Sequence, residues 1–169
     1  MWEVINCMKI KADKEKLLNG IQIVQNIVSS KTTLPILNNI LIETRKDNLR
    51  LVATDLDIGI SCEILVETLE EGGITIPAKR FVDIVREMPS GNIGVTVKKN
   101  NQIDIEGENC RFKLMGLPKD EFPKFPEFKE RDVFQIEQKI FKDMLRLTSF
   151  SVSHEESRYV LNGVLLEIT

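Results

Sequence analysis

The sequence predicts an α+β fold, in which amphipathic helices pack on antiparallel sheets built as two similar halves. Three observations predict it. Short alternations of apolar and polar residues recur along the chain, as in half-buried strands. Two longer segments, residues 14–28 and 79–88, instead repeat apolar residues at helical spacing. Each of these segments follows one strand and precedes several, so the order strand, helix, strands occurs twice before residue 126.

The first half begins with a strand over residues 8–12, and Asp13 is a suitable N-cap for the helix over residues 14–28. The apolar stripe of this helix comprises Leu17, Leu18, Ile21, Val24 and Val28. Gly20 weakens the helix slightly. After a polar loop over residues 29–33, further alternation predicts strands over residues 36–43, 49–54 and 55–64, and a turn over residues 70–73.

The second half repeats this order. A short strand over residues 74–77 leads into the helix over residues 79–88, which ends at the turn residues Pro89-Ser90-Gly91-Asn92. Strands are then predicted over residues 93–98, 102–106 and 110–115. Two such halves predict a pseudo-symmetric domain in which each helix covers a sheet.

A second domain is expected after residue 126. Residues 119–126 contain two prolines and four charges, which predicts an exposed linker. The opening order then restarts with a strand over residues 134–137, a helix over 139–150 and a strand over 160–168. So short a unit hides too little surface to bury a core. We therefore expect residues 127–169 to be the beginning of a domain, and the chain to be part of a longer protein.

The composition excludes several classes of protein. Hydrophobic residues make up 42% and charged residues 29%, as in soluble globular proteins, and we find neither a bilayer-spanning run nor a signal peptide. A cytoplasmic protein is therefore expected. The net charge of −3 does not itself indicate nucleic-acid binding, although a local basic stripe can act within an acidic molecule. Three cysteines without CxxC spacing and a single histidine predict reduced thiols, no metal site and no cofactor.

Five segments of the sequence form a combination that is specific to one protein family. They are TTLPILNNILIE (32–43), LVATDLDIGI (51–60), ITIPAKRFVDIVREMP (74–89), CRFKLMGLPKDEFP (110–123) and SRYVLNGVLLE (157–167). In this order and spacing they resemble the bacterial DNA sliding clamp, the beta subunit of DNA polymerase III. The resemblance begins at Met8, which makes residues 1–7 an N-terminal extension, residues 8–126 the first clamp domain and residues 127–169 the start of the second.

The resemblance implies a DNA-clamp fold and a non-catalytic processivity factor. In this family two protomers of three domains each close head-to-tail into a ring around duplex DNA, with helices lining the hole. The ring tethers the replicative DNA polymerase and is handled by a clamp loader, so the implied partners are DNA, polymerase, loader and a second protomer, with no membrane. We do not expect these 169 residues alone to close a ring. An alternative is a stand-alone interaction domain that binds a clamp protomer or the clamp loader without encircling DNA.

Cations on the expected helices are candidate DNA contacts. Lys139, Lys142 and Arg146 share one helix face, and Lys79 and Arg86 share another. A solvated face is the ordinary interpretation of such residues. The resemblance instead places these helices at the hole, where cations would attract phosphates without distinguishing bases.

Two loops resemble those that touch DNA in the family. The first holds Lys31, and the matching loop after the third helix holds His154, with Tyr159 nearby. Glu155 in the second loop is a poor partner for a phosphate.

Two further pairs correspond to protein contacts in the family. Arg158 and Leu161 match positions of the hydrophobic cleft that binds peptide motifs, although a strand-edge arginine and a core leucine explain them equally well. Arg80 and Arg111 match the edge of the first domain that meets another protomer, while surface salt bridges are the simpler explanation.

The sequence offers little for catalysis, and no catalytic residue is predicted. Asp55 and Asp57 could suggest a metal site, but two acidic residues are insufficient, and a structural role in a turn or strand edge is preferred. His154 with Glu155, Glu156 and Ser157 could suggest hydrolysis, yet neighbours in sequence do not make a triad.

Overall fold

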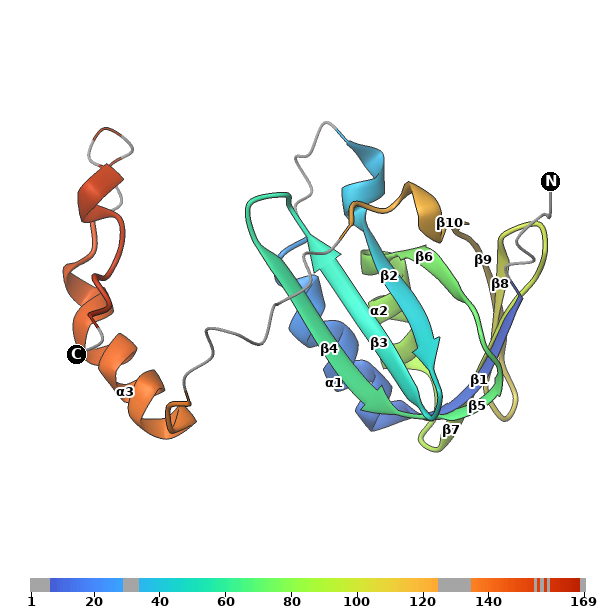
Figure 1. Ribbon diagram of the computed structural model, residues 1–169. Helices are drawn as coiled ribbons and strands as arrows, with labels where there is room; N and C mark the ends of the chain where they lie inside the picture. Colours follow the sequence, from blue (N-terminus) through green and yellow to red (C-terminus); the bar gives the residue numbers. More distant parts are fainter. Residues whose placement is uncertain are drawn as a thin grey trace. The chain divides into compact units, whose positions relative to one another are not determined.

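A computed structural model describes residues 7–28, 34–124, 135–153, 155, 157 and 159–167 (Figure 1). The chain divides into two compact units, unit 1 (Met1–Phe125) and unit 2 (Pro126–Thr169). The described part of unit 1 contains two five-stranded antiparallel sheets with helices packed on them, which confirms the predicted α+β fold. Among the described residues, no helix is long and apolar enough to cross a membrane.

The two sheets have related strand orders. Sheet A has the order β5-β1-β7-β8-β9, and its strands are β1 (Met8–Asp13), β5 (Glu67–Glu70), β7 (Asn92–Val97), β8 (Gln102–Glu106) and β9 (Arg111–Met115). Sheet B has the order β10-β6-β2-β3-β4, and its strands are β2 (Asn39–Arg45), β3 (Asn48–Thr54), β4 (Gly59–Leu65), β6 (Gly73–Pro77) and β10 (Leu117–Pro118). Each sheet therefore ends in two strands that have one paired side, β5 and β9 in sheet A and β10 and β4 in sheet B.

An internal two-fold relation links the sheets. If β1 to β5 are exchanged in order for β6 to β10, the strand order of sheet A becomes that of sheet B. The helices α1 (Lys14–Gln25) and α2 (Ala78–Glu87) exchange at the same time, since each follows the first strand of its half. The predicted pseudo-symmetric halves are thus confirmed, and each half contributes its first and last strands to the other half's sheet.

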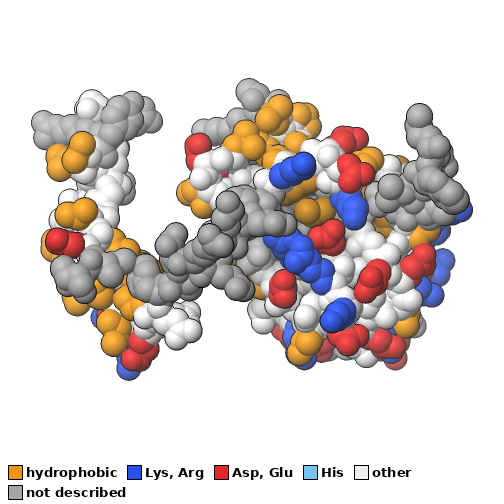
Figure 2. Space-filling model, viewed as in Figure 1, with side chains coloured by type: hydrophobic (Ala, Val, Ile, Leu, Met, Phe, Trp, Pro, Cys, Tyr) orange, Lys and Arg blue, Asp and Glu red, His pale blue; other side chains and the backbone are white. Residues whose placement is uncertain are grey.

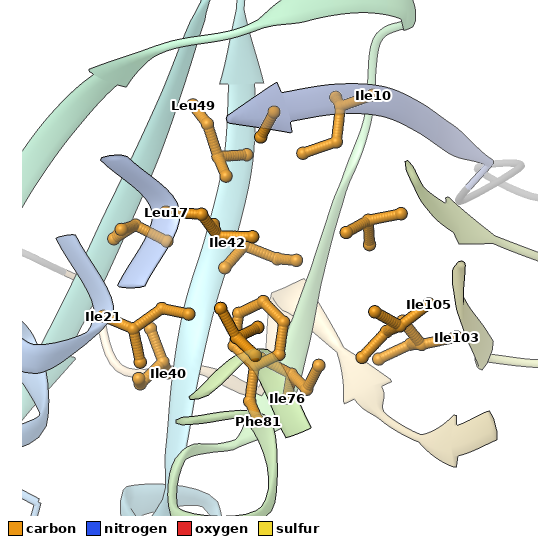
Figure 3. Packing of buried hydrophobic residues seen from close by; sticks show 14 of the residues in the cluster. Ile10, Leu17, Ile21, Ile40, Ile42, Leu49, Ile76, Phe81, Ile103 and Ile105 are labelled. Carbon is orange, nitrogen blue, oxygen red and sulfur yellow. The ribbon is translucent and has the colours of Figure 1, made fainter. Parts of the chain in front are cut away.

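One hydrophobic core joins both sheets and both helices. Figure 3 shows Leu17 and Ile21 of α1 and Phe81 of α2 among isoleucines and leucines of the two sheets. Phe81, Leu17 and Ile21 are each fully buried. Asp13 begins α1 as predicted, because its carboxylate accepts a hydrogen bond from the backbone N–H of Lys16 at 3.1 Å.

Two strand predictions fail at their first residues. Residues 36–43 were expected to be a strand, but Pro35–Asn38 forms a 3-10 helix (η1) before β2, because proline at its start has a fixed φ and no N–H for a ladder. Residues 55–58 form a tight turn rather than the start of β4. Asp55 Oδ1 accepts hydrogen bonds from the N–H groups of Asp57 (3.0 Å) and Ile58 (2.7 Å). Leu56 in this turn has φ +83°.

Two other expectations around the sheets are corrected. The predicted turn over residues 70–73 begins one residue too early, because β5 extends to Glu70 and pairs with β1. The first part of the predicted exposed linker instead packs on unit 1. Phe122 is buried, and Lys119 Nζ lies 3.4 Å from Glu43 Oε1 on β2. Residues 125 and 126 lie outside the described residues.

Unit 2 contains the predicted helix, α3 (Gln138–Thr148), but the described part of the flanking segments is not in strands. Residues 135–137 have no regular structure, and residues 159–161 form a 3-10 turn (η5) where a strand over 160–168 was expected. A strand requires a partner for its backbone groups, and the described residues of unit 2 offer none. The helix buries no residue, and Ile140, Met144 and Leu147 are between 47% and 67% exposed.

Candidate nucleic-acid interface

The helix pair α1 and α2 presents a charged, polar surface away from the core. The exposed cations on the two helices are Lys16, Lys79, Arg80 and Arg86, and the exposed carboxylates are Glu15, Asp83 and Glu87. This leaves one positive charge in excess, within a chain whose net charge is −3. The exposed amides Asn19 and Gln22 add neutral hydrogen-bonding groups on α1. Such a surface can attract phosphates without holding them tightly.

Local contacts reduce how much of this charge is available. Arg86 Nη1 lies 3.4 Å from Asp83 Oδ1, one turn earlier on α2. Lys14 at the start of α1 donates through its ammonium group to the carbonyl of Met88, just beyond the end of α2. Lys14 therefore ties the two helices together and stabilises the negative end of the α2 dipole. Lys79, in the first turn of α2, is exposed.

The outer face of sheet B does not form a concentrated basic patch. Figure 2 shows acidic and basic side chains intermixed over the face that carries β2, β3 and β4. The sheet face offers mixed charge.

The remaining predicted DNA contacts fall in unit 2 or outside the described residues. Lys139, Lys142 and Arg146 are exposed on α3, and Arg146 Nη2 lies 3.5 Å from Asp143 Oδ1. The helix keeps these three cations at the predicted spacing on one side. Lys31, His154 and the side chain of Tyr159 lie outside the described residues.

The two predicted peptide-cleft residues are not brought into a described pocket. Leu161 is 52% exposed in η5, and Arg158 lies outside the described residues. Leu161 is therefore not a core residue of the described part of unit 2.

The predicted protomer edge contains a small pocket of about 260 Å³. Arg80 of α2 lines it together with Lys113 and Met115 of β9. Arg111 lies at the other end of β9, where its Nη2 is 2.8 Å from Glu106 Oε1 on β8. Arg80 thus borders β9 and Arg111 belongs to it, but of the two only Arg80 lines the pocket. Met115 is 60% exposed, which makes this edge partly apolar.

A buried carboxylate lies one strand inward from this edge. Asp104 of β8 is only 5% exposed, and its carboxylate contacts Lys98 Nζ at 2.6 Å and Gln102 Nε2 at 2.7 Å. The hydrogen bond from Lys98, followed by that from Gln102, lowers the pKa of Asp104. On the opposite sheet, burial raises the pKa of the Cys62 thiol, and neighbouring Glu63 raises it further.

The acidic pair in TDLD has the structural role that the sequence favoured. Asp55 caps the turn before β4, as its two backbone hydrogen bonds indicate. Thr54 Oγ1 stabilises the same turn by donating to the carbonyl of Ile58 at 2.8 Å.

Sequence reasoning missed the contacts that depend on tertiary structure. The Lys14–Met88 hydrogen bond joins residues 74 positions apart, and the place of Lys113 beside Arg80 depends on which strand forms the edge of sheet A. For Lys14 the sequence offered one indication of a role at a helix end, namely its position directly after the N-cap Asp13.

Comparison with known proteins agrees with this architecture. A beta sliding clamp from Chlamydia muridarum is 38% identical over 162 residues, which cover 96% of this chain and 44% of the relative. The beta sliding clamp of Escherichia coli K12 is 35% identical, over 95% of this chain and 44% of its own length. The chain thus spans less than half the length of these curated relatives.

Solved structures give the same result. A sliding clamp (DNA polymerase III subunit beta) from Bartonella birtlesii, bound to griselimycin, superposes with a TM-score of 0.87 at 34% identity, over 93% of this chain and 42% of that one. The sliding clamp of Bacillus subtilis superposes with a TM-score of 0.86 at 32% identity, over 90% and 42% of the two chains. Residues 8–126 match the family described as DNA polymerase III beta subunit, N-terminal domain, and the chain therefore belongs to this family.

Proposed function

We propose that the chain acts in a DNA polymerase processivity factor, a sliding clamp that encircles duplex DNA as a head-to-tail ring and tethers the replicative polymerase. Residues 8–126 form its first clamp domain, residues 127–169 belong to the second, and residues 1–7 precede the first. The factor performs no catalysis itself, acts in the cytoplasm and is placed on DNA by a clamp loader. Family membership over residues 8–126 supports the proposal.

The observation that carries the proposal is the small positive excess on the α1 and α2 surface. A tight DNA-binding protein concentrates cations, because each phosphate contact adds affinity. A sliding protein needs attraction without fixed sites, and carboxylates beside Lys79 and Arg86 provide that balance. Lys31, Lys139, Lys142, Arg146, His154 and Tyr159 are proposed to extend this contact.

Two protein contacts complete the proposal. Arg80 and Arg111 border the β9 edge, which we assign to another protomer. Arg158 and Leu161 are assigned to a peptide cleft that receives polymerase and loader segments. The exposure of Leu161 supports this assignment, because its apolar side chain is available to contact a peptide.

The test is retention on circular DNA. A three-domain clamp protomer that includes this sequence is loaded on a nicked plasmid with clamp loader and ATP, because these 169 residues alone are not expected to close a ring, and bound and free protein are separated by gel filtration. Retention on the circle followed by release after linearisation is expected, because a ring slides off a free end. Retention that survives linearisation contradicts a topological mechanism.

A second candidate is a stand-alone interaction domain that binds a clamp protomer or the clamp loader without encircling DNA. The outer side of β9, which pairs with no strand among the described residues, and the exposed Met115 favour it. It predicts capture of a clamp protomer or the loader in the absence of DNA, and no loading onto circles.

A further inference from the structure

The outer face of sheet A, on the side away from the core, contains a hollow of about 560 Å³. Its floor is β7, one wall is β1, and the other wall is the end of β8 with the turn after it. Residues 89–91, between α2 and β7, close one end. The volume lies within the range of about 300–1,000 Å³ that is typical of ligand sites. None of the residues assigned above to DNA, to the peptide cleft or to another protomer lines this hollow.

Gly94 lies on the floor of the hollow, and packing within unit 1 does not require a glycine there. Its outward side carries no side chain, because Ile93 and Val95 on either side point into the core. An added Cβ would meet only the carbonyl oxygen of Glu106, at 3.9 Å, which is an ordinary contact. Gly116, by contrast, has no space, since its Cβ would lie 2.4 Å from a backbone oxygen. Glycine weakens a strand interior and often marks a place where another molecule approaches the backbone closely.

Charged residues flank Gly94 in one row across the sheet. Lys11 of β1 and Glu106 of β8 are its two neighbours in the ladder. Lys11 contacts Glu67 of β5 at 4.0 Å, and Glu106 contacts Arg111 of β9 at 2.8 Å. Both ion pairs are directed away from the hollow, so neither crosses Gly94. An ammonium group has three donors and a carboxylate has about four acceptor sites, so both groups can bind a further partner.

The two walls of the hollow have opposite charge. Lys9 adds a second cation on β1, and Glu108 adds a second carboxylate in the turn after β8. Neither Lys9 nor Glu108 forms an ion pair with another described residue. A simple anion such as phosphate therefore meets as much repulsion as attraction. A ligand that carries both signs of charge finds a partner on each wall.

The spacing of the walls fits an extended peptide. β1 and β8 are two strand spacings apart, about 10 Å. The charged groups of Lys11 and Glu106 lie further apart than this, because each leans toward a partner on the strand beyond. Side chains on one face of an extended peptide repeat every two residues, so the first and fifth residues are about 14 Å apart. An acidic and a basic residue at these positions can reach the two walls, with the third residue over Gly94.

The space over Gly94 suits a flat, apolar side chain. Pro89 borders the hollow together with Leu69, which is 56% exposed. An aromatic ring that lies on the glycine backbone contacts the strand where no Cβ intervenes, and it covers these two apolar side chains at the same time.

We propose that this hollow is a docking site for an extended peptide segment of a partner protein, which places an aromatic side chain on Gly94 between an acidic residue at Lys11 and a basic residue at Glu106. The site goes beyond the proposed function, because it requires neither DNA nor a closed ring and uses none of the residues assigned to the peptide cleft. A short segment on an open sheet face makes the contact weak, since small interfaces form transient complexes.

The test is an NMR titration of the whole isotope-labelled chain with short peptides. The probe is acetyl-Glu-Ser-Trp-Ser-Lys-amide. Control peptides of the same length replace Trp by Gly, or carry Glu at both charged positions, or carry Lys at both. The probe should shift the amide resonances of Lys11, Gly94 and Glu106. It should bind at least about fivefold more tightly than each control, because each control loses one of the three contacts.

Gly94→Val is the decisive variant. An added Cβ has space and valine favours strands, so the urea midpoint of unfolding should be no lower than that of the unchanged chain. Binding of the probe should nevertheless weaken at least about tenfold, because the new side chain fills the floor of the hollow. The matched control is Thr96→Val, at the next outward position of β7, which leaves the space unchanged and should keep the binding.

Lys11→Glu tests the arrangement of charge. This variant should bind the probe about tenfold more weakly and should bind the control peptide with two lysines more tightly than the unchanged chain does. Lys99→Glu, in the turn between β7 and β8, makes the same change of charge outside the hollow and should have neither effect.

The proposal is overturned if the probe does not bind, if the like-charged peptides bind equally well, or if Gly94→Val binds the probe as tightly as the unchanged chain. Equal competition by N-acetyltryptophanamide would also overturn it, by assigning the hollow to a small molecule. A lower average mass of Gly94→Val in analytical ultracentrifugation would assign the hollow to a second copy of the chain instead. None of these outcomes affects retention on circular DNA, so this proposal and the proposed function can fail separately.

Discussion

Asp104 is a buried carboxylate whose charge is held by Lys98 and Gln102. Its pKa is lowered in the folded chain, so the unfolded chain binds a proton more readily. The stabilising contribution is therefore complete above the ordinary carboxyl pKa of about 4 and is lost as the pH falls through the lower, folded-state pKa. Asp104→Ala is expected to reduce the free energy of unfolding by about 1–3 kcal/mol at neutral pH.

Urea denaturation at several pH values measures this effect. The difference between Asp104→Ala and the unchanged chain should shrink as the solution is acidified below about pH 4. Glu108→Gln, at an exposed turn, serves as the control and should change stability by no more than about 0.5 kcal/mol. A pH-independent difference would contradict an origin in the Asp104 charge.

Gly20 shows how packing can reverse a local preference. On helix propensity alone, Gly20→Ala would stabilise α1 by about 1 kcal/mol. In the fold, an added Cβ would lie 2.7 Å from Leu51 Cδ1 and 3.0 Å from Ile64 Cγ2, because α1 packs directly on β3 and β4. Overpacking of this kind costs about 1–3 kcal/mol. We expect net destabilisation of Gly20→Ala in thermal unfolding, whereas a raised melting temperature would contradict the close approach.

At the residue scale, the sequence predicted what depends on neighbours in the chain. Asp13 was identified as an N-cap because its partner, Lys16, is three residues away. The Asp104–Lys98 contact and the Lys14–Met88 bond were not predicted, because they depend on strand pairing and on how two helices meet. The tight space at Gly20 could not be predicted either, since it is set by side chains of a sheet.

The helix pair α1 and α2 carries the prediction about DNA. Binding of a short duplex should be weak, independent of sequence and strongly reduced by salt. Changing both Lys79 and Arg86 to Glu should weaken it further and make the slope of log affinity against log salt shallower by up to about 2. Fluorescence anisotropy at several salt concentrations measures both quantities.

The controls separate this surface from total charge. Lys99→Glu, in the exposed turn between β7 and β8, changes charge away from the helices and should leave the slope unchanged. A similar loss with Lys99→Glu would indicate a general charge effect. Binding that differs between two unrelated duplexes would contradict contact through phosphates alone.

At the element scale, helices were predicted more accurately than strands. The apolar spacing of α1, α2 and α3 placed the start of each helix within one residue, although α1 ends at Gln25 rather than residue 28. The alternation that predicts strands also continues through segments that fold otherwise. Pro35 converts the start of one such segment into η1, and Asp55 converts another into a turn. β5 was missed because its short sequence, ETLE, shows little alternation.

The two units of the molecule should differ in local stability. Helix α1 buries Leu17, Ile21 and Val24, whereas no residue of α3 is buried. Amides in α1 should therefore exchange with solvent only on global unfolding, while those in α3 exchange through local opening. Mass spectrometry after hydrogen exchange tests this, with α2 as a second protected reference. Equal protection of α1 and α3 would contradict the difference in packing.

The architecture of unit 1 was predictable because its two halves repeat in order, and resemblance to the clamp family supplied the rest. The sheet order was not predictable from periodicity, since alternation shows which residues are buried but does not identify a strand's neighbours. Strands after residue 134 were predicted from a repeated pattern. The pattern is present, but the described residues there form no strand.

The exchange of β1 and β5 for β6 and β10 between the halves also constrains how the protein is made. β1 pairs with β7, and β6 is flanked by β2 and β10, so neither sheet is complete until residues near 118 have been synthesised. A ribosome must release almost all of unit 1 before its core can close. During that interval the isoleucine-rich strands have no final partners, and pairing between distant segments is slow. Chaperone protection of the nascent chain is thus most needed during synthesis of the second half.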